Sequence, residues 1–127
     1  MRYLMLLYGD ESAYASVTPE QMGQMLADYN AFHGEMAQRG NMLAAERLQP
    51  SMTATTVSVS NGKTITTDGP FVETKEQLAG IYVFECKDLD EAIEVAAKIP
   101  AARHGKIEVR PIMEVPTEEE LANLPQE

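Results

Sequence analysis

The segment Arg2-Tyr3-Leu4-Met5-Leu6-Leu7-Tyr8 carries apolar side chains at nearly every position. Its apolar and aromatic side chains fall at odd and even positions alike, whereas a strand with one face in water alternates apolar with polar residues. Residues 78–86 show the same pattern, with apolar side chains on both faces. Both segments therefore predict β-strands that are covered on both sides, and the first predicts a central strand.

Two segments carry the signals of helices. Thr18-Pro19-Glu20-Gln21 combines an N-cap residue, a proline that needs no amide hydrogen bond and a glutamine placed for a capping box, so a helix is expected from residue 19 to Gly40. Its expected buried face consists of Met22, Met25, Leu26, Tyr29, Phe32 and Met36. A similar capping pattern at Asp88 and Glu91 predicts a second helix, which ends near Pro100 and buries Leu89, Ala92, Ile93 and Ala96.

The remaining strands complete an α+β fold. Residues 42–48 and 106–114 are strand candidates. Residues 55–67 predict a hairpin, because β-branched residues flank Asn61-Gly62, a pair that favours positive φ at both turn positions. The order β-α-β, inserted hairpin, β-α-β is the ferredoxin-like split arrangement with an antiparallel sheet.

This arrangement leaves one face of the sheet without cover. Two helices cover only one face, yet both central strands are apolar on both faces. No remaining segment of the chain is long enough to bury the second face. A second copy that packs sheet on sheet is the simplest solution, so the sequence predicts a homodimer.

Length and composition limit the class of protein. The chain has 127 residues, 44% of them hydrophobic, which suits one domain over residues 1–115 with an acidic tail over residues 116–127. The formal net charge of −10 disfavours nucleic acids and anionic membranes as partners, because their phosphates repel an acidic protein. No apolar run approaches the ~20 residues that span a bilayer, and the first residues lack a signal-peptide cleavage pattern. Cys86 is the only cysteine, which agrees with a cytoplasmic location.

The turn Asp68-Gly69-Pro70-Phe71 and the charged residues after it form a first candidate site. In a structural role, Asp68 accepts backbone hydrogen bonds and Phe71 enters the core; in a functional role, Asp68 is a base or an anchor beside a pocket. Glu73 and Lys75 share one face of an extended segment, where Lys75 would tune the carboxylate of a catalytic base. An ordinary surface ion pair is the alternative for these two residues.

A second candidate site lies on the sheet. Glu108 and Arg110 share a face of the last strand because they are two residues apart, and Glu46 joins them if the register allows. Arg110 is the best anchor for an anionic small molecule, because a guanidinium binds a carboxylate or phosphate with two hydrogen bonds. Tyr8 offers a phenol to the same place from the end of the first strand. The structural alternatives are an ion pair of Arg110, with Glu108 or across the dimer, and a core position for Tyr8.

Other chemistries have no support in the sequence. Two histidines without neighbouring cysteines make no zinc pattern, and Cys86 lies among apolar neighbours as an inert thiol. Motifs for serine hydrolysis, nucleotide hydrolysis and dinucleotide binding are missing. We therefore expect neither a metal nor a cofactor.

Residues 67–80, Thr-Asp-Gly-Pro-Phe-Val-Glu-Thr-Lys-Glu-Gln-Leu-Ala-Gly, resemble the signature of the DGPF proteins, a branch of the YCII-related family. Further segments similar to that family are residues 6–10, 48–50, 53–57, 99–103 and 107–112, so the resemblance extends to about residue 115. It implies the dimeric α/β barrel fold. The wider superfamily includes monooxygenases, isomerases and peroxidases, so the fold by itself does not select a reaction.

The resemblance also bears on mechanism and context. Some YCII-like relatives carry a histidine–aspartate pair proposed to be catalytic, but here the first strand ends in Tyr8-Gly9-Asp10 without a histidine. His33 and His104 lie outside the segments that resemble the family, which argues against a histidine-based mechanism. DGPF proteins are often encoded beside extracytoplasmic-function sigma factors, which implies a regulatory context.

Two functional hypotheses follow. In the first, a cytoplasmic homodimer holds a small anionic or polar metabolite in a pocket of each subunit and performs cofactor-independent acid–base chemistry such as isomerisation. Asp68 or Glu73 would be the base, Lys75 its tuning partner and Arg110 the anchor. In the second, the protein is a non-catalytic accessory that senses a ligand or binds a protein partner, in a sigma-factor circuit. The sequence leaves open whether the protein is an enzyme.

Overall fold

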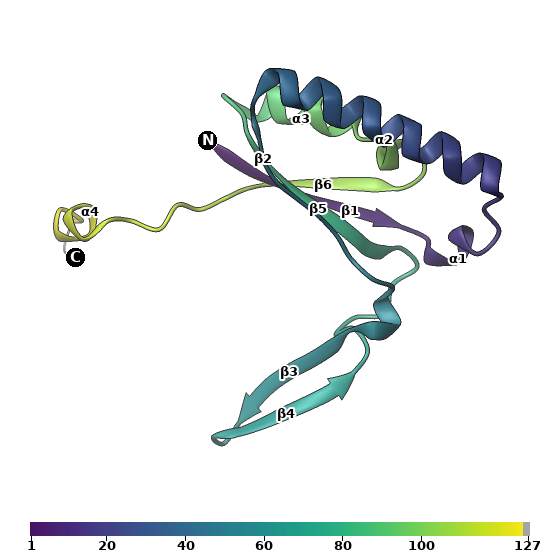
Figure 1. Cartoon of the computed structure of the whole chain (residues 1–127). Coiled ribbons are helices and arrows are strands. Elements are labelled where there is room, and N and C mark those ends of the chain that lie inside the picture. Colours follow the sequence, from purple (N-terminus) through teal and green to yellow (C-terminus); the bar gives the residue numbers. More distant parts are fainter. Residues whose placement is uncertain (126–127) are drawn as a thin grey trace.

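A four-stranded antiparallel sheet forms the body of the molecule (Figure 1). The computed structural model describes residues 1–125. The strands are β1 (Arg2–Gly9), β2 (Met42–Arg47), β5 (Gln77–Glu85) and β6 (Lys106–Pro111), in the spatial order β2-β5-β1-β6. Each neighbouring pair is antiparallel, and β1 is a central strand, as predicted. This order confirms the α+β class and matches the ferredoxin-like arrangement.

Helices cover one face of this sheet. The two long helices, α2 (Pro19–Arg39) and α3 (Leu89–Lys98), both lie on the same side of it (Figure 1). Shorter helical segments are α1 (Glu11–Tyr14), α4 (Glu118–Ala122) and the 3-10 turns η1 (Ser51–Thr53) and η2 (Pro100–Arg103). Within residues 1–125, no helix combines the length and apolar character needed to cross a membrane.

The inserted hairpin forms a sheet of its own. β3 (Thr55–Ser60) and β4 (Lys63–Asp68) pair with each other, and the hairpin projects from the body on the side opposite to α2 and α3 (Figure 1). The turn residues Asn61 and Gly62 have φ values of 50° and 76°, as the Asn-Gly pair predicted.

The ends of α2 confirm the capping signals. The Thr18 side-chain oxygen accepts a hydrogen bond from the backbone N–H of Gln21, and the Gln21 side chain accepts one from the N–H of Thr18. Gly40 ends the helix with a φ of 69°, a left-handed conformation that costs glycine little.

The core lies between the helices and the sheet. Its buried members are Tyr3, Met5, Leu7, Phe32, Met36, Tyr82, Phe84, Cys86, Ala92, Val95, Ala96 and Ile99. The odd-numbered residues of β1 point toward the helices, whereas Leu4, Leu6 and Tyr8 point to the other face and are half-buried.

The predicted helix faces were wrong in part. Met22 and Leu26 are exposed, because the buried residues of α2, Phe32 and Met36, both lie in its C-terminal half. On α3, the buried stripe runs through Ala92, Val95 and Ala96, and small alanine side chains let the helix approach the sheet closely. The exposed residues Leu89 (51%) and Ile93 (52%) were predicted to be buried and lie one stripe further round the helix.

Phe71 also contradicts its predicted place in the core, because 87% of its surface is exposed. The physical reason is that the chain just before Phe71 is tied to the base of the hairpin. Gly69 donates a backbone hydrogen bond to Ala54 at 2.7 Å, and the Thr56 hydroxyl donates to the Gly69 carbonyl at 2.9 Å. Phe71 therefore leaves the root of the hairpin toward solvent.

Two glycines provide a test of this packing. Gly105→Ala is expected to lower the melting temperature, because a Cβ there would lie 2.0 Å from the backbone oxygen of Tyr8 in β1. Gly34→Ala is the matched control, since a Cβ at this position in α2 meets no atom within 4 Å. Alanine is favoured over glycine in a helix interior by about 1 kcal/mol, so this variant is expected to melt higher. Thermal unfolding followed by circular dichroism compares the two, and equal melting temperatures would contradict the packing described.

Candidate functional site

The face of the sheet opposite the helices, here called the open face, collects four of the predicted site residues. Glu46 in β2 lies opposite Ile81 in β5, which lies opposite Leu6 in β1, and Leu6 lies opposite Glu108 in β6. Residues directly opposite each other across antiparallel strands point to the same face. Glu46 and Glu108 therefore lie at the two ends of a row of side chains that crosses the sheet, and the apolar residues Ile81 and Leu6 lie between them.

The neighbouring rows bring Arg110 and Tyr8 to the same face. Arg110 lies opposite Leu4, which in turn lies opposite Val83. Tyr8 lies opposite Lys106 at the other end of β1. The open face thus has an apolar middle and charged groups along both edges, and the predicted sharing of one face by Glu46, Glu108 and Arg110 agrees with the register.

Arg110 is the more accessible of two guanidinium groups near this edge. Its Nε lies 3.9 Å from Oε2 of Glu108, and both side chains are more than half exposed, so the ion pair is loose. Arg2, by contrast, holds Glu114 with two hydrogen bonds of 2.8 and 2.9 Å. This contact raises the pKa of Arg2 and lowers the pKa of Glu114. Arg110 is therefore better placed than Arg2 to meet an external anion.

A network of hydrogen bonds ties the end of β1 to the hairpin root. The Glu11 carboxylate accepts hydrogen bonds from the backbone N–H and the hydroxyl of Ser51, at 2.6 and 2.7 Å. The N–H of Glu11 donates to the Gln77 side chain at 2.9 Å. Sequence reasoning missed this anchor because its members lie 40 and 66 residues apart and carry no local signal.

The neighbouring acidic groups also have structural partners. Asp10 accepts hydrogen bonds from the hydroxyl and the N–H of Ser12 at the start of α1, which lower its pKa. Lys106 and Glu76 form an ion pair of 2.5 Å between β6 and the residue just before β5. These contacts hold together the sheet end from which the hairpin leaves.

The candidate acid–base residues lie apart from Arg110. Asp68 is the last residue of β4, and Glu73 and Lys75 follow in the connection to β5; all three are exposed. Within the described chain, Glu73 and Lys75 do not form an ion pair with each other. Gln77, where this connection ends, lies opposite Gly9, whereas Arg110 lies opposite Leu4 nearer the other end of β1. Within one chain, the candidate acid–base residues Asp68, Glu73 and Lys75 therefore do not lie close to Arg110, the candidate ligand anchor.

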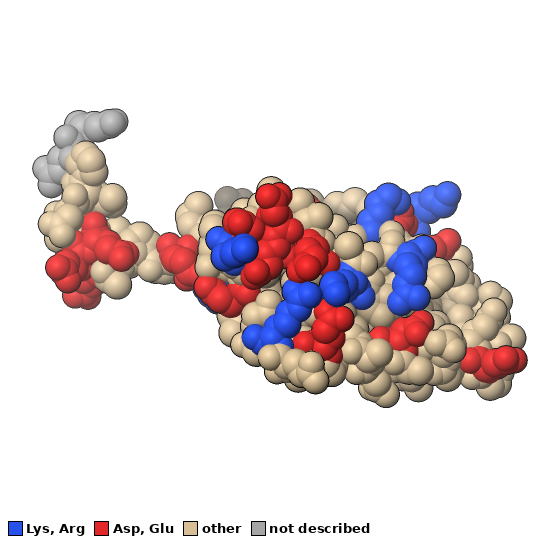
Figure 2. All heavy atoms as spheres, turned by 90° about the horizontal axis from the view of Figure 1, so that it is seen from above, with Lys and Arg blue, Asp and Glu red and all other residues tan. Residues whose placement is uncertain are grey.

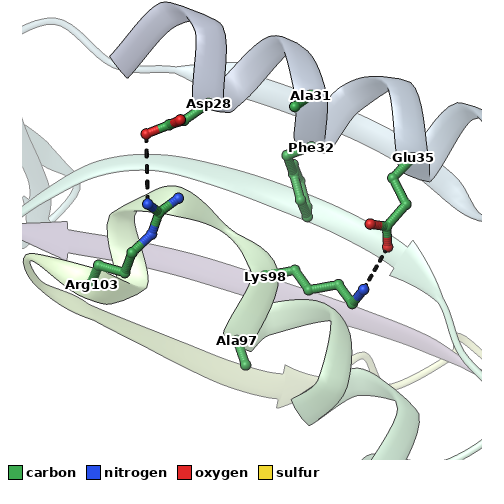
Figure 3. Close-up of a pocket in the computed structure, with 7 residues that line it drawn as sticks. All are labelled: Asp28, Ala31, Phe32, Glu35, Ala97, Lys98 and Arg103. Carbon is green, nitrogen blue, oxygen red and sulfur yellow. Dashed lines mark hydrogen bonds and ion pairs between the residues drawn. The ribbon is translucent and has the colours of Figure 1, made fainter. Parts of the chain in front are cut away.

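A hollow on the helix side was not anticipated from the sequence. It has a volume of about 330 Å³ and lies between α2, α3 and η2 (Figure 3). Lys98 meets Glu35 at 2.8 Å, and Arg103 lies 3.6 Å from Asp28. Because each of these cations already faces a carboxylate, the hollow offers a balanced set of charges and favours no anion.

His33 belongs to the packing between α2 and β5. Its Nε2 and the phenol oxygen of Tyr82 are joined by a hydrogen bond of 2.8 Å, and both rings pack against Phe32. Burial raises the pKa of Tyr82 to about 12, with a smaller contribution from Tyr29. The side chain of His33 thus fixes the helix on the sheet. Within residues 1–125, no group of three or more histidine, cysteine or acidic side chains is arranged to hold a metal ion.

Tyr82 makes the pH dependence of stability testable. In a titration of tyrosine absorbance, its phenol is expected to ionise later than exposed tyrosines, and Tyr82→Phe should reduce this late ionisation to the part that comes from Tyr29, whose pKa burial also raises. The unfolded chain releases this proton near pH 10, so the stabilisation is complete below pH 10 and is lost as the pH rises to about 12. Simultaneous ionisation of all five tyrosines near pH 10 would contradict the buried position.

Comparison with known proteins agrees with this fold and with the resemblance of residues 67–80. The sequence matches the YCII-related domain over residues 1–116. It is also 39% identical over 114 residues to an uncharacterised protein of Rhizobium meliloti (strain 1021), an alignment that covers 88% of this chain and 92% of that protein. The match takes in both central strands, the inserted hairpin and all the predicted site residues. The chain therefore belongs to the YCII-related family.

Proposed function

We propose that the protein is a homodimer in which the open faces of two sheets pack together, as in a dimeric α/β barrel, and that each subunit binds a small anionic or polar molecule. The observation that carries this proposal is the composition of the open face, with half-buried apolar side chains in its middle and Arg110 at its edge. The closing of this face by a second copy would turn an exposed edge into a pocket.

The contrast between the two sides of the molecule supports the packing. The helix-covered side carries acidic and basic side chains interspersed over its surface (Figure 2). Several of them form ion pairs between α2 and α3, among them Arg39 with Glu94 and Lys98 with Glu35. Such a surface is well solvated. The middle of the open face, with Leu4, Leu6 and Ile81, has no such charges and gains more from being covered.

The edge residues support the choice of ligand. A charge that becomes buried on dimerisation needs a partner, and the loose contact between Arg110 and Glu108 leaves the guanidinium free to take one. Its planar fork fits a carboxylate or a phosphate. Glu46, Glu108 and the phenol of Tyr8 would supply the remaining hydrogen-bonding groups. If the protein is an enzyme, we assign proton transfer to Asp68 or Glu73, tuned by Lys75 and without a cofactor.

One observation favours a second function, that of a non-catalytic protein-binding accessory. Phe71 and Val72 are exposed at the hairpin root, and solvent-exposed aromatic residues are typical of protein interfaces. Capture of a single protein partner, together with no ligand effect, would favour this function over the first.

The dimer is tested by sedimentation equilibrium of Leu6→Lys. The wild type is expected to be dimeric and this variant monomeric, because a charge in the middle of the open face would be buried without a partner. Leu89→Lys, at an exposed position of α3, is the control and should stay dimeric. A monomeric wild type, or equal behaviour of the two variants, would contradict the proposed packing.

Ligand binding is tested by thermal shift against a panel of dicarboxylates, sugar phosphates and inorganic phosphate. A ligand at about 100 times its Kd adds about 2.7 kcal/mol of stability and raises the midpoint by several degrees. Arg110→Ala should lose this shift. Arg103→Ala, which removes a guanidinium from the helix side, should keep it. Equal shifts in both variants would remove Arg110 as the anchor, and no shift across the panel would remove the anion site.

A further inference from the structure

The hairpin of β3 and β4 has two chemically different faces. Val57 lies opposite Thr66, and Val59 lies opposite Thr64, so both valines share one face. The other face carries Ser58, Ser60, Lys63 and Ile65. The alternation Val-Ser-Val-Ser is typical of a strand that is buried on one side. Yet Val57 and Val59 are 60% and 70% exposed in the single chain.

The hairpin needs a neighbour for its stability. A two-stranded hairpin alone is marginally stable in water, because it buries little apolar surface. Its root is fixed to the body through Ser51 and Glu11, but its strands form a separate sheet that projects away from the body (Figure 1). Phe71, 87% exposed beside that root, adds another large apolar side chain in need of cover.

The position of the hairpin indicates what covers it. It projects on the side of the open face, which is the side where the second copy lies in the dimer proposed above (Figure 1). Its strands of six residues are about 20 Å long, close to the length of the sheet strands. The hairpin of each copy is therefore long enough to lie along the other copy.

The area of the interface points to the same occupant. At about 16 Å² of sheet per residue, the four strands of the open face project an area of roughly 450 Å². A stable interface buries about 800 Å² on each partner. The valine face of the hairpin, which projects on the same side as the open face, would add apolar surface to the area that the two copies bury.

We propose that the hairpin is an arm that packs its valine face, with Phe71 at its root, against the second copy of this chain. This proposal rests on the proposed dimer and adds to it. In a two-fold symmetric pair, each copy gives one arm and receives one. Asp68 lies opposite Thr55 and shares the face of Val57 and Val59, so the arm carries this carboxylate to the surface of the partner. An acid–base site that uses Asp68 would then be built from both chains.

The test compares two double variants of the full chain by sedimentation equilibrium. Val57→Asp with Val59→Asp places two charges on the proposed docking face and is expected to weaken the dimer at least tenfold. Ser58→Asp with Ser60→Asp places the same two charges on the opposite face of the same strand. This control variant has the same net charge and also carries two aspartates in β3. Its dimer dissociation constant is expected to stay within about twofold of that of the wild type.

The outcomes separate this proposal from the proposed dimer. If both double variants dimerise alike while Leu6→Lys is monomeric, the dimer stands and the arm is wrong. If the wild type is monomeric, both proposals fail.

Hydrogen exchange of the wild type supplies a measurement that does not depend on the folding of any variant. The amides of β3 and β4 are expected to be protected at concentrations where the dimer forms and to lose protection on dilution. Rapid exchange of these amides in the intact dimer would overturn the proposal. Protection that appears only when another protein is added would also overturn it, and would assign the arm to that partner.

Discussion

The two long helices cover only one face of β1, although β1 has apolar side chains on both faces. Tyr3, Met5 and Leu7 are buried beneath α2 and α3, whereas Leu4 and Leu6 face away from both helices. Full burial of a leucine contributes about 1.5–3 kcal/mol to the free energy of folding. The half-buried residues of the open face therefore gain only part of this free energy in a single chain. Each 1.4 kcal/mol recovered on association is a tenfold gain in affinity. The apolar side chains of two central strands thus favour assembly before any ligand is considered.

Electrostatics would act against the proposed association and would help to select its geometry. Each chain carries a net charge of −10, so two copies repel each other at long range. The ion pairs of α2 and α3 keep the helix-covered side in water (Figure 2). On the open face, the charges lie in the edge strands β2 and β6 and at one end of the central strands, at Arg2 and Glu85, where water or a ligand reaches them. Packing through the apolar middle therefore brings two acidic molecules together with the least desolvation of charge.

Local sequence signals predicted the elements well, and long-range packing explains what they missed. The capping box at Thr18, the turn at Asn61-Gly62 and the two-faced pattern of β1 each involve residues a few positions apart. The hydrogen bonds of Ser51 with Glu11 and of His33 with Tyr82 join residues 40 and 49 positions apart, and no local pattern marks them. On α3, Ala92 and Ala96 are buried as predicted, but Leu89 and Ile93 are exposed and Val95 is buried, because hydrophobic spacing alone does not say which apolar residues pack closest to the sheet. For the candidate site, strand alternation and register placed Glu46, Glu108 and Arg110 together, but the exposed connection after β4 has no periodicity that would position Glu73 or Lys75.

The hairpin and β1 share one feature, since each has apolar side chains that a single chain does not bury. Both have apolar side chains on a face that the described part of the chain leaves uncovered, and the hairpin projects on the side of the open face (Figure 1). The alternation of valine with serine in β3 is typical of a strand with one buried face, and β-strand propensity favours valine at these positions as well. Phe71, which sequence reasoning assigned to the core, fits the same explanation if the core that it enters belongs to the assembled pair. In the proposed dimer, the patterns that predict burial would be satisfied by two chains, because the faces left open in one chain would be covered by the other.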